Sequence, residues 1–207
     1  MTEEVITRKK KPRVRDRIFA AACELFYWQG VRAVGVDAIV SAAGTNKMSF
    51  YRAFASKDDL VAAYVRQEVE DSLAHWQAIL DAHAGDALAQ ARAFFKAHLT
   101  ETCAEASRGC PLSNVAVELS ETQHPARAII EEYKSEMRHR FRKLAGEMGT
   151  PTPDALGDTL MLLWEGAYLS PLTFHAQRGP AQHVADAAEA VIKAFVPAAQ
   201  SAAEPAS

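Results

Sequence analysis

Apolar residues recur every three or four positions along most of the chain. Val65, Val69, Leu73, Trp76 and Leu80 follow one another at spacings of four, four, three and four, the pattern of a helix with one buried face. No run of alternating Val, Ile or Thr residues indicates a strand. The pattern therefore predicts an all-α protein.

Proline, glycine and polar residues divide the pattern into about nine segments. We expect helices over about residues 13–29, a short one ending at 42–44, then 46–54, 57–81, 87–106, 111–121, 126–148, 154–177 and 180–196. Residues 1–12, which include the basic run Arg8–Lys11, are expected to be a disordered arm, and residues 198–207 a disordered tail.

Residues 34–57 predict two short helices joined by a tight turn at Gly44. The second of these has Phe50 and Phe54 on one face, and its other face carries Lys47, Met48, Ser49, Tyr51 and Arg52. A helix this short does not fold alone. A cation, hydroxyls and an aromatic ring on its free face are what a recognition helix presents to the DNA major groove. On spacing alone, a solvated helical hairpin is the alternative.

The segment AGTNKMSFYRAFASKDDL resembles the end of the DNA-binding domain of TetR-family transcriptional regulators, the TetR/AcrR-like repressors. The close resemblance covers about residues 14–65, and the rest of the chain matches only in layout. It implies an N-terminal three-helix helix-turn-helix domain over residues 13–58. It also implies a C-terminal helical ligand-binding and dimerisation domain over residues 59–197.

The resemblance also implies a DNA-binding surface. Three residues match positions that reach base edges: Lys47, Met48 and Arg52. Three others match positions that contact phosphates: Ser49, Tyr51 and Lys57. Phosphate contact alone is the alternative for Lys47 and Arg52. Thr45, Asn46 and Gly35 belong to the same expected surface. Gly35 stands where relatives often carry a hydroxyl, so a phosphate contact there must come from backbone N–H or from Arg32.

The net charge of −3 conceals an asymmetry. Residues 1–60 hold 11 Lys and Arg against 7 Asp and Glu, whereas residues 61–207 hold 12 against 19. A basic first quarter suits contact with double-stranded DNA. No apolar stretch is long enough to span a bilayer and the N-terminus is not signal-like, so we expect a cytoplasmic protein without a membrane partner.

The C-terminal part offers candidate ligand and dimer residues. The rings of six residues are expected to line an inducer cavity, with a polar end from Asn114 and Glu118: Trp76, Phe95, His98, Tyr133, Trp164 and Tyr168. Two apolar stripes are expected to form the homodimer interface as a four-helix bundle: Leu156, Leu160, Leu163 and Ala167, then Ala187, Val191 and Phe195. For both sets the alternative is the chain's own packed core.

Motifs of enzymes are absent from the sequence: there is no Gly-x-Ser-x-Gly, His-Glu-x-x-His or phosphate-binding loop, and we expect no metal or cofactor. The sequence favours a homodimeric repressor released from a palindromic operator by a small hydrophobic or amphipathic inducer. A single helix that carries both Lys57 and Trp76 would couple the two sites. A transcriptional activator and a thiol-based redox regulator using Cys103 and Cys110 are the alternatives.

Overall fold

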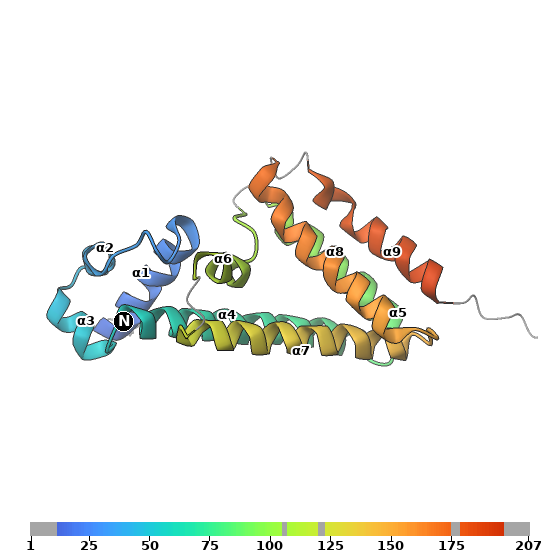
Figure 1. The fold of residues 1–207 in the computed structure, drawn as a ribbon, viewed down its shortest axis with the longest axis horizontal. Helices are drawn as coiled ribbons and strands as arrows, with labels where there is room; N and C mark the ends of the chain where they lie inside the picture. The colour runs from blue at the N-terminus through green and yellow to red at the C-terminus, as the bar shows by residue number, and fades with distance from the viewer. Residues whose placement is uncertain (1–11, 105–106, 120–122, 175–178, 197–207) are drawn as a thin grey trace, which may run out of the picture. The chain divides into compact units, whose positions relative to one another are not determined.

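The computed structural model describes residues 12–104, 107–119, 123–174 and 179–196. Every regular element within these ranges is a helix, so the all-α prediction is confirmed (Figure 1). No helix in this described part is long and apolar enough to cross a lipid bilayer.

The helices follow the predicted order. Their bounds are α1 Val14–Gln29, α2 Val36–Ala42, α3 Lys47–Ala53, α4 Lys57–Ala82, α5 Ala87–Thr102, α6 Pro111–Glu118, α7 Pro125–Glu147, α8 Pro153–Thr173 and α9 Val184–Phe195. A 3₁₀ turn, η1, spans Pro180–His183 ahead of α9, where one continuous helix was predicted. Such turns are common at helix N-termini. The predicted ends of α5 and α8 fall in residues 105–106 and 175–178, outside the described residues.

The chain forms two compact units, Met1–Tyr64 and Val65–Ser207. The boundary expected at residue 58 lies in the first turn of α4, and the boundary of the structure lies further along the same helix. The helix α4 therefore contributes its start to the first unit and the rest to the second.

The first unit is a three-helix cluster completed by the start of α4. Ile18 of α1, Ile39 of α2, Phe50 of α3 and Leu60 of α4 are each fully buried. Gly44 has a φ of 60°, the left-handed conformation that glycine adopts without strain, and this allows the short turn between α2 and α3. These contacts fix α3 by its Phe50 side and leave its other side free.

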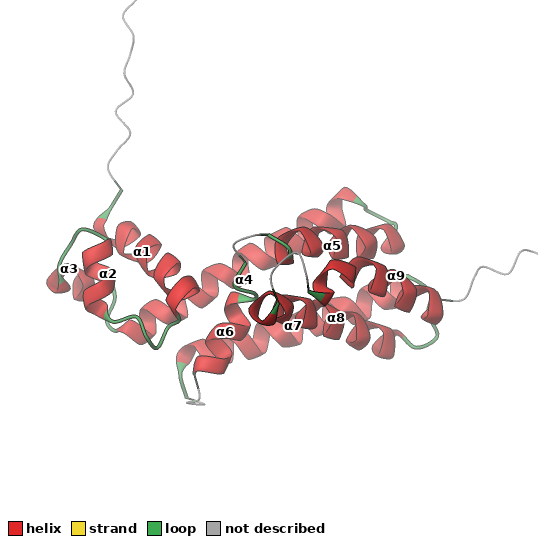
Figure 2. Ribbon diagram, turned by 90° about the horizontal axis from the view of Figure 1, so that it is seen from above, coloured by secondary structure: helices red, strands yellow, loops and turns green. Residues whose placement is uncertain are grey.

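The second unit packs α5, α7, α8 and α9 alongside one another (Figure 2). The helices α7 and α8 approach closely at Gly157, where an added Cβ would lie 2.6 Å from the Cα of Arg142. Asp158 joins the same two helices, because its carboxylate accepts hydrogen bonds from Arg138 and Arg142 at 2.6 to 2.9 Å. The lack of a side chain at Gly157 and the ion pairs of Asp158 thus hold α7 and α8 together.

Candidate DNA-binding surface and ligand cavity

The turn before α3 is built from residues that the sequence assigned to DNA contact. The Oδ1 of Asn46 accepts a hydrogen bond from the backbone N–H of Ser49 at 3.0 Å, which caps the helix. The backbone N–H of Thr45 donates to the Val40 carbonyl at 2.9 Å, and Thr45 is half-buried. Both residues therefore position α3, whatever they also contact.

The free side of α3 presents four side chains to solvent. Met48 is 66% exposed and Tyr51 57% exposed, and Lys47 and Arg52 are exposed as well. Ser49 is half-buried. Phe50, on the opposite side, is fully buried and meets the Tyr51 ring edge-on at 5.2 Å. The helix thus separates a buried face from an exposed face within seven residues.

Lys47 is held by a neighbour that the sequence reading missed. Its Nζ lies 2.8 Å from the carboxylate of Asp37, in the first turn of α2. This contact raises the pKa of Lys47, first through the hydrogen bond and then through the charge of Asp37. The ammonium must leave Asp37, or share it, to reach a base edge. Asp37 stands ten positions before Lys47, and no helical spacing joins the two residues.

The start of α4, which carries Lys57, also carries a serine cap and two acids. Ser56 caps the helix, because its Oγ accepts from the Asp59 N–H at 3.0 Å and donates to the Asp59 carboxylate at 2.8 Å. Asp58 and Asp59 place two carboxylates in this first turn. A phosphate contact here would therefore depend on the half-buried Lys57.

Gly35 is the N-cap of α2. It makes no side-chain cap, and its φ of −90° and ψ of 163° are open to any residue. A Cβ built at Gly35 meets no atom within 4 Å. The missing hydroxyl is therefore a feature of this chain and not a requirement of its backbone.

In the second unit, three of the residues predicted to line a ligand cavity belong to the packed core. Trp76, Phe95 and His98 are each at most 2% exposed. The Trp76 ring lies 4.7 Å from that of Phe94 and 5.0 Å from that of Phe141. This burial favours the alternative of a packed core for the three residues, although Trp76 also lines a separate hollow of about 230 Å³.

His98 is enclosed among aromatic rings. Its Nε2 lies 2.9 Å from the Trp164 carbonyl, and its ring stands edge-on to that of Tyr168 at 4.3 Å. Burial lowers the pKa of His98 to about 4, and the hydrogen bond to Trp164 opposes this only in part. The imidazole is therefore neutral at pH 7, and Nε2 donates to the carbonyl.

The other three predicted rings do line a cavity. Tyr133, Trp164 and Tyr168 face a hollow of about 310 Å³ between α4, α5, α6, α7 and α8. Its remaining lining residues are Glu68, Asp71, Ser72, His75, Glu101, Cys110, Pro111 and Leu112. Asn114 and Glu118, expected at its polar end, are not among them. The amide of Asn114 instead donates to the Arg108 carbonyl at 2.9 Å.

Carboxylates supply the polar end of this cavity. Glu101 lies 3.1 Å from the hydroxyl of Tyr168, which donates to it, and 3.4 Å from Nε2 of His75. Burial raises the pKa of Glu68, and the charge of Asp71 raises it further. Sequence reasoning missed these acids, although residues 68, 71 and 75 share one face of α4.

The wall formed by α6 depends on Gly109. Its φ of 73° favours glycine, and an added Cβ would lie 2.5 Å from the Tyr168 carbonyl oxygen. Gly109 thereby lets Cys110 and Pro111 approach α8 at the cavity. Cys103 and Cys110 are free thiols, and the buried Cys110 Sγ accepts from the Ser113 N–H at 3.5 Å.

Comparison with known proteins identifies the family that shares this arrangement. Residues 18–64 match the family described as bacterial regulatory proteins, tetR family. A transcriptional regulator of this family from Streptomyces avermitilis is 29% identical, with 86% of this chain and 88% of that chain covered at a TM-score of 0.68. The chain belongs to the TetR family.

Two further structures of TetR regulators agree. One from Rhodobacter sphaeroides is 27% identical at a TM-score of 0.70, with 88% of this chain and 99% of that chain covered. One from Streptomyces coelicolor has a TM-score of 0.84 at 24% identity, with 89% and 96% covered, and shows the shared fold. No curated protein matches the chain. This protein is therefore a TetR-family transcriptional regulator.

The stripe predicted to form a dimer interface on α8 of this TetR regulator is divided between core and surface. Leu156 and Leu160 have no exposed surface and face the chain's own core, whereas Leu163 and Ala167 line an apolar groove. Leu163, Ala187, Val191 and Phe195 are half-buried. The exposed large apolar side chains of α8 are Leu162, at 70%, Leu169, at 60%, and Leu172, at 46%.

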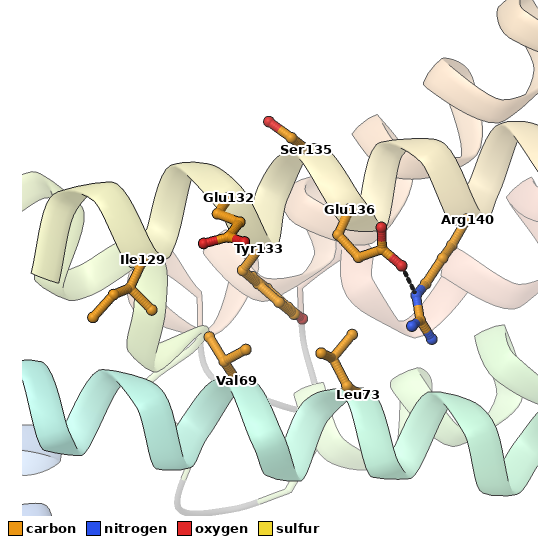
Figure 3. A pocket seen from close by; sticks show the side chains of 8 residues that line it. All are labelled: Val69, Leu73, Ile129, Glu132, Tyr133, Ser135, Glu136 and Arg140. Carbon is orange, nitrogen blue, oxygen red and sulfur yellow. Dashed lines mark hydrogen bonds and ion pairs between the residues drawn. The ribbon is translucent and has the colours of Figure 1, made fainter.

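A second hollow of this TetR regulator lies between α4 and α7, shown in Figure 3. Val69 and Leu73 of α4 face Tyr133 of α7 across it, and the ion pair of Glu136 with Arg140, at 2.6 Å, closes one end. It is open to solvent and holds one predicted ligand residue, Tyr133. The smaller cavity beside Glu68 gathers three of them and is the better candidate.

Proposed function

We propose that this TetR-family regulator is a homodimeric repressor, released from a palindromic operator by a small hydrophobic or amphipathic molecule. The observation that carries the proposal is the division of α3 into a buried anchor, Phe50, and an exposed face of Lys47, Met48, Tyr51 and Arg52. We place this action in the cytoplasm, where operator DNA is accessible.

The exposed side chains of α3 suit the two kinds of DNA contact. Lysine and arginine donate to guanine O6 and N7, and the apolar Met48 can meet a thymine methyl group. The hydroxyl of Tyr51 and the ammonium of Lys57 can bind phosphates, which fix register without reading sequence. Arg52 and Lys47 would then decide which operator is preferred.

Two copies are needed to read a palindrome, and α8 with α9 offers the surface. The exposed Leu162 of α8 lines an apolar groove shared with η1 and α9, together with Leu163, Ala167 and Ala187. A second copy of this surface would cover these residues in a four-helix arrangement.

Sedimentation of variants tests this interface. Leu162→Glu is expected to give monomers, because it buries a charge in the interface. Val117→Glu is the matched control, since Val117 is 85% exposed on α6 and away from α8 and α9. A Leu162→Glu protein that stays dimeric would remove α8 from the interface.

Release by a ligand requires two states of the dimer that differ in ligand affinity. The helix α4 is one continuous element that includes Lys57 in the first unit and Glu68, Asp71 and Ser72 of the cavity in the second. A ligand that prefers the state with weaker DNA binding then lowers operator affinity, and operator DNA lowers ligand affinity by the same factor.

Selection of fragments of the host genome bound in vitro tests the whole proposal. The bound fragments are expected to share a palindrome, and transcription from the adjacent promoter is expected to fall when the protein is added. Increased transcription would identify an activator. Fragments without a common sequence would contradict operator recognition altogether.

A thiol switch is separable from ligand release. Loss of operator binding after oxidation, abolished by Cys110→Ser, would support the redox alternative. We favour the ligand, because Cys110 is only 7% exposed and its Sγ accepts a backbone hydrogen bond.

A further inference from the structure

We propose that the cavity between α4, α5, α6, α7 and α8 binds an organic cation, a compact molecule with a quaternary or protonated amine on an aromatic or aliphatic body. The inference rests on the proposed function, because it names the ligand class of the site through which the repressor would be released. It is argued from the charge of the residues that line the cavity, from the absence of a counterion for Glu68 among the described residues, and from the aromatic rings of the cavity walls.

The charge of the cavity lining is one-sided. Three carboxylates face it, those of Glu68, Asp71 and Glu101, and the described lining residues include neither lysine nor arginine. The imidazole of His75 is the single basic side chain among them, and it already lies 3.4 Å from Glu101. An anionic ligand would therefore be repelled, whereas a cation would be attracted.

The carboxylate of Glu68 has no counterion among the residues that the structure describes. In the described part of the chain it makes no ion pair or hydrogen bond, whereas Asp71 accepts from the Gln67 amide at 3.0 Å. Burial and the nearby Asp71 charge both raise the pKa of Glu68, so the folded protein holds this charge at a cost. A bound cation would offset that cost through its own charge.

The walls of the cavity are aromatic. The rings of Trp164 and Tyr168 stand edge to face at 5.7 Å, and Tyr133 completes this side. The Trp164 ring already receives the ammonium of Lys134 at 4.7 Å, so cation–π contact is in use at this residue. Glu165, 2.9 Å away, balances the Lys134 charge, and Lys134 does not line the cavity.

The spacing of the acids favours a bulky cation over a metal ion. No group of three or more His, Cys, Asp or Glu side chains among the described residues is close enough to hold a metal. The cavity of about 310 Å³ lies at the lower end of the roughly 300–1,000 Å³ usual for small-molecule sites. A charge spread over a quaternary ammonium suits acids that stand apart.

Calorimetric titration of the full-length protein with benzyltrimethylammonium tests the proposal. The neutral comparison is 2-methyl-1-phenylpropan-2-ol, which has nearly the same shape, at equal ionic strength. The cation is expected to bind with a Kd below about 1 mM and at least about fivefold more tightly than the alcohol. Equal affinities, or no binding of the cation at this level, would overturn the inference.

Two isosteric variants locate the binding. Glu68→Gln is expected to weaken binding of the cation about fivefold and to leave binding of the alcohol unchanged. Glu70→Gln, exposed on the same helix and absent from the cavity lining, is expected to change neither. If both variants weaken cation binding equally, the effect comes from the overall charge of the protein, and the proposed site is wrong.

Operator affinity, measured separately, distinguishes this inference from the proposed function. A neutral compound that releases operator while the cation fails to bind would overturn the cation site and leave the repressor standing. Specific cation binding that leaves operator affinity unchanged would support the site and remove its role in release.

Discussion

The two units of this regulator use similar residue types in opposite ways. In the first unit, aromatic and charged side chains of α3 divide cleanly, with Phe50 fully buried and Tyr51 57% exposed. In the second, Trp76 packs in the core while Trp164 and Tyr168 both pack and line a cavity. A surface site is defined by which residues are exposed. The cavity of the second unit instead joins buried rings to half-buried and exposed polar side chains.

The largest expected effect tests whether Trp76 belongs to the core. Trp76→Ala should lower the free energy of unfolding by about 3–5 kcal/mol, because it leaves a cavity beside Phe94 and Phe141. Urea unfolding at fixed protein concentration measures it. Tyr168→Phe, which removes only the hydroxyl that donates to Glu101, is the comparison and should cost far less. A small loss of unfolding free energy in Trp76→Ala would contradict the assignment of Trp76 to the core.

A second test uses the titration of His98. Its pKa is about 4 when folded and about 6.5 when unfolded, so the unfolded state binds more protons between these values. The stabilising contribution is complete above pH 6.5 and is lost as the pH falls towards 4. Between pH 7.5 and 4.5 the wild type should lose roughly 2 kcal/mol more than His98→Gln, which keeps a donor for Trp164 but does not titrate. Parallel pH profiles of the two proteins would contradict the enclosed, neutral histidine.

A smaller effect concerns the phosphate contacts of the first unit. Tyr51→Phe and Lys57→Ala should each weaken operator and non-operator DNA alike, by about 1 kcal/mol. Loss of the Lys57 charge should also reduce the slope of log affinity against log salt by about 0.9. Fluorescence anisotropy over a salt series measures both. An unchanged slope for Lys57→Ala would indicate that capping by Ser56 and the nearby acids keep phosphates away.

The smallest expected effect is a gain. Gly35→Ser should stabilise the first unit by a few tenths of a kcal/mol, because the backbone is extended and the added atoms meet no neighbour. It should also strengthen DNA binding if the new hydroxyl reaches a phosphate. Thermal unfolding and anisotropy report the two effects separately. Gly35→Ala, without a hydroxyl, is the control and should give neither gain.

The sequence predicted the helices and the exposed face of α3, because apolar spacing determines which side of a helix is buried. It did not predict which aromatic residues border a cavity. Trp76 and Tyr168 occur in similar helical patterns, and only the packing of α4, α5, α6 and α8 separates them. The acids Glu68 and Glu101 were missed for the same reason, since charges on a helix usually face solvent.

The choice of stripe on α8 shows a related limit. Leu156 and Leu162 are both apolar residues of one helix, and periodicity alone does not say which side the rest of the chain will cover. The close approach of α7 at Gly157 directs Leu156 inward and leaves Leu162 at the surface. Contacts between distant segments, and not the local pattern, determine which side of α8 is buried.

The central claim is that the exposed face of α3 reads base sequence, and Lys47 tests it most directly. The measurement is selection of preferred DNA from a random library by wild type and by Lys47→Ala, with Lys57→Ala as the variant expected to affect phosphate contact alone. We predict that Lys47→Ala relaxes the preference at one position of each half-site, by about 1–3 kcal/mol of discrimination, and that Lys57→Ala keeps the wild-type preference. The same preferred sequence from all three proteins would contradict base reading by Lys47.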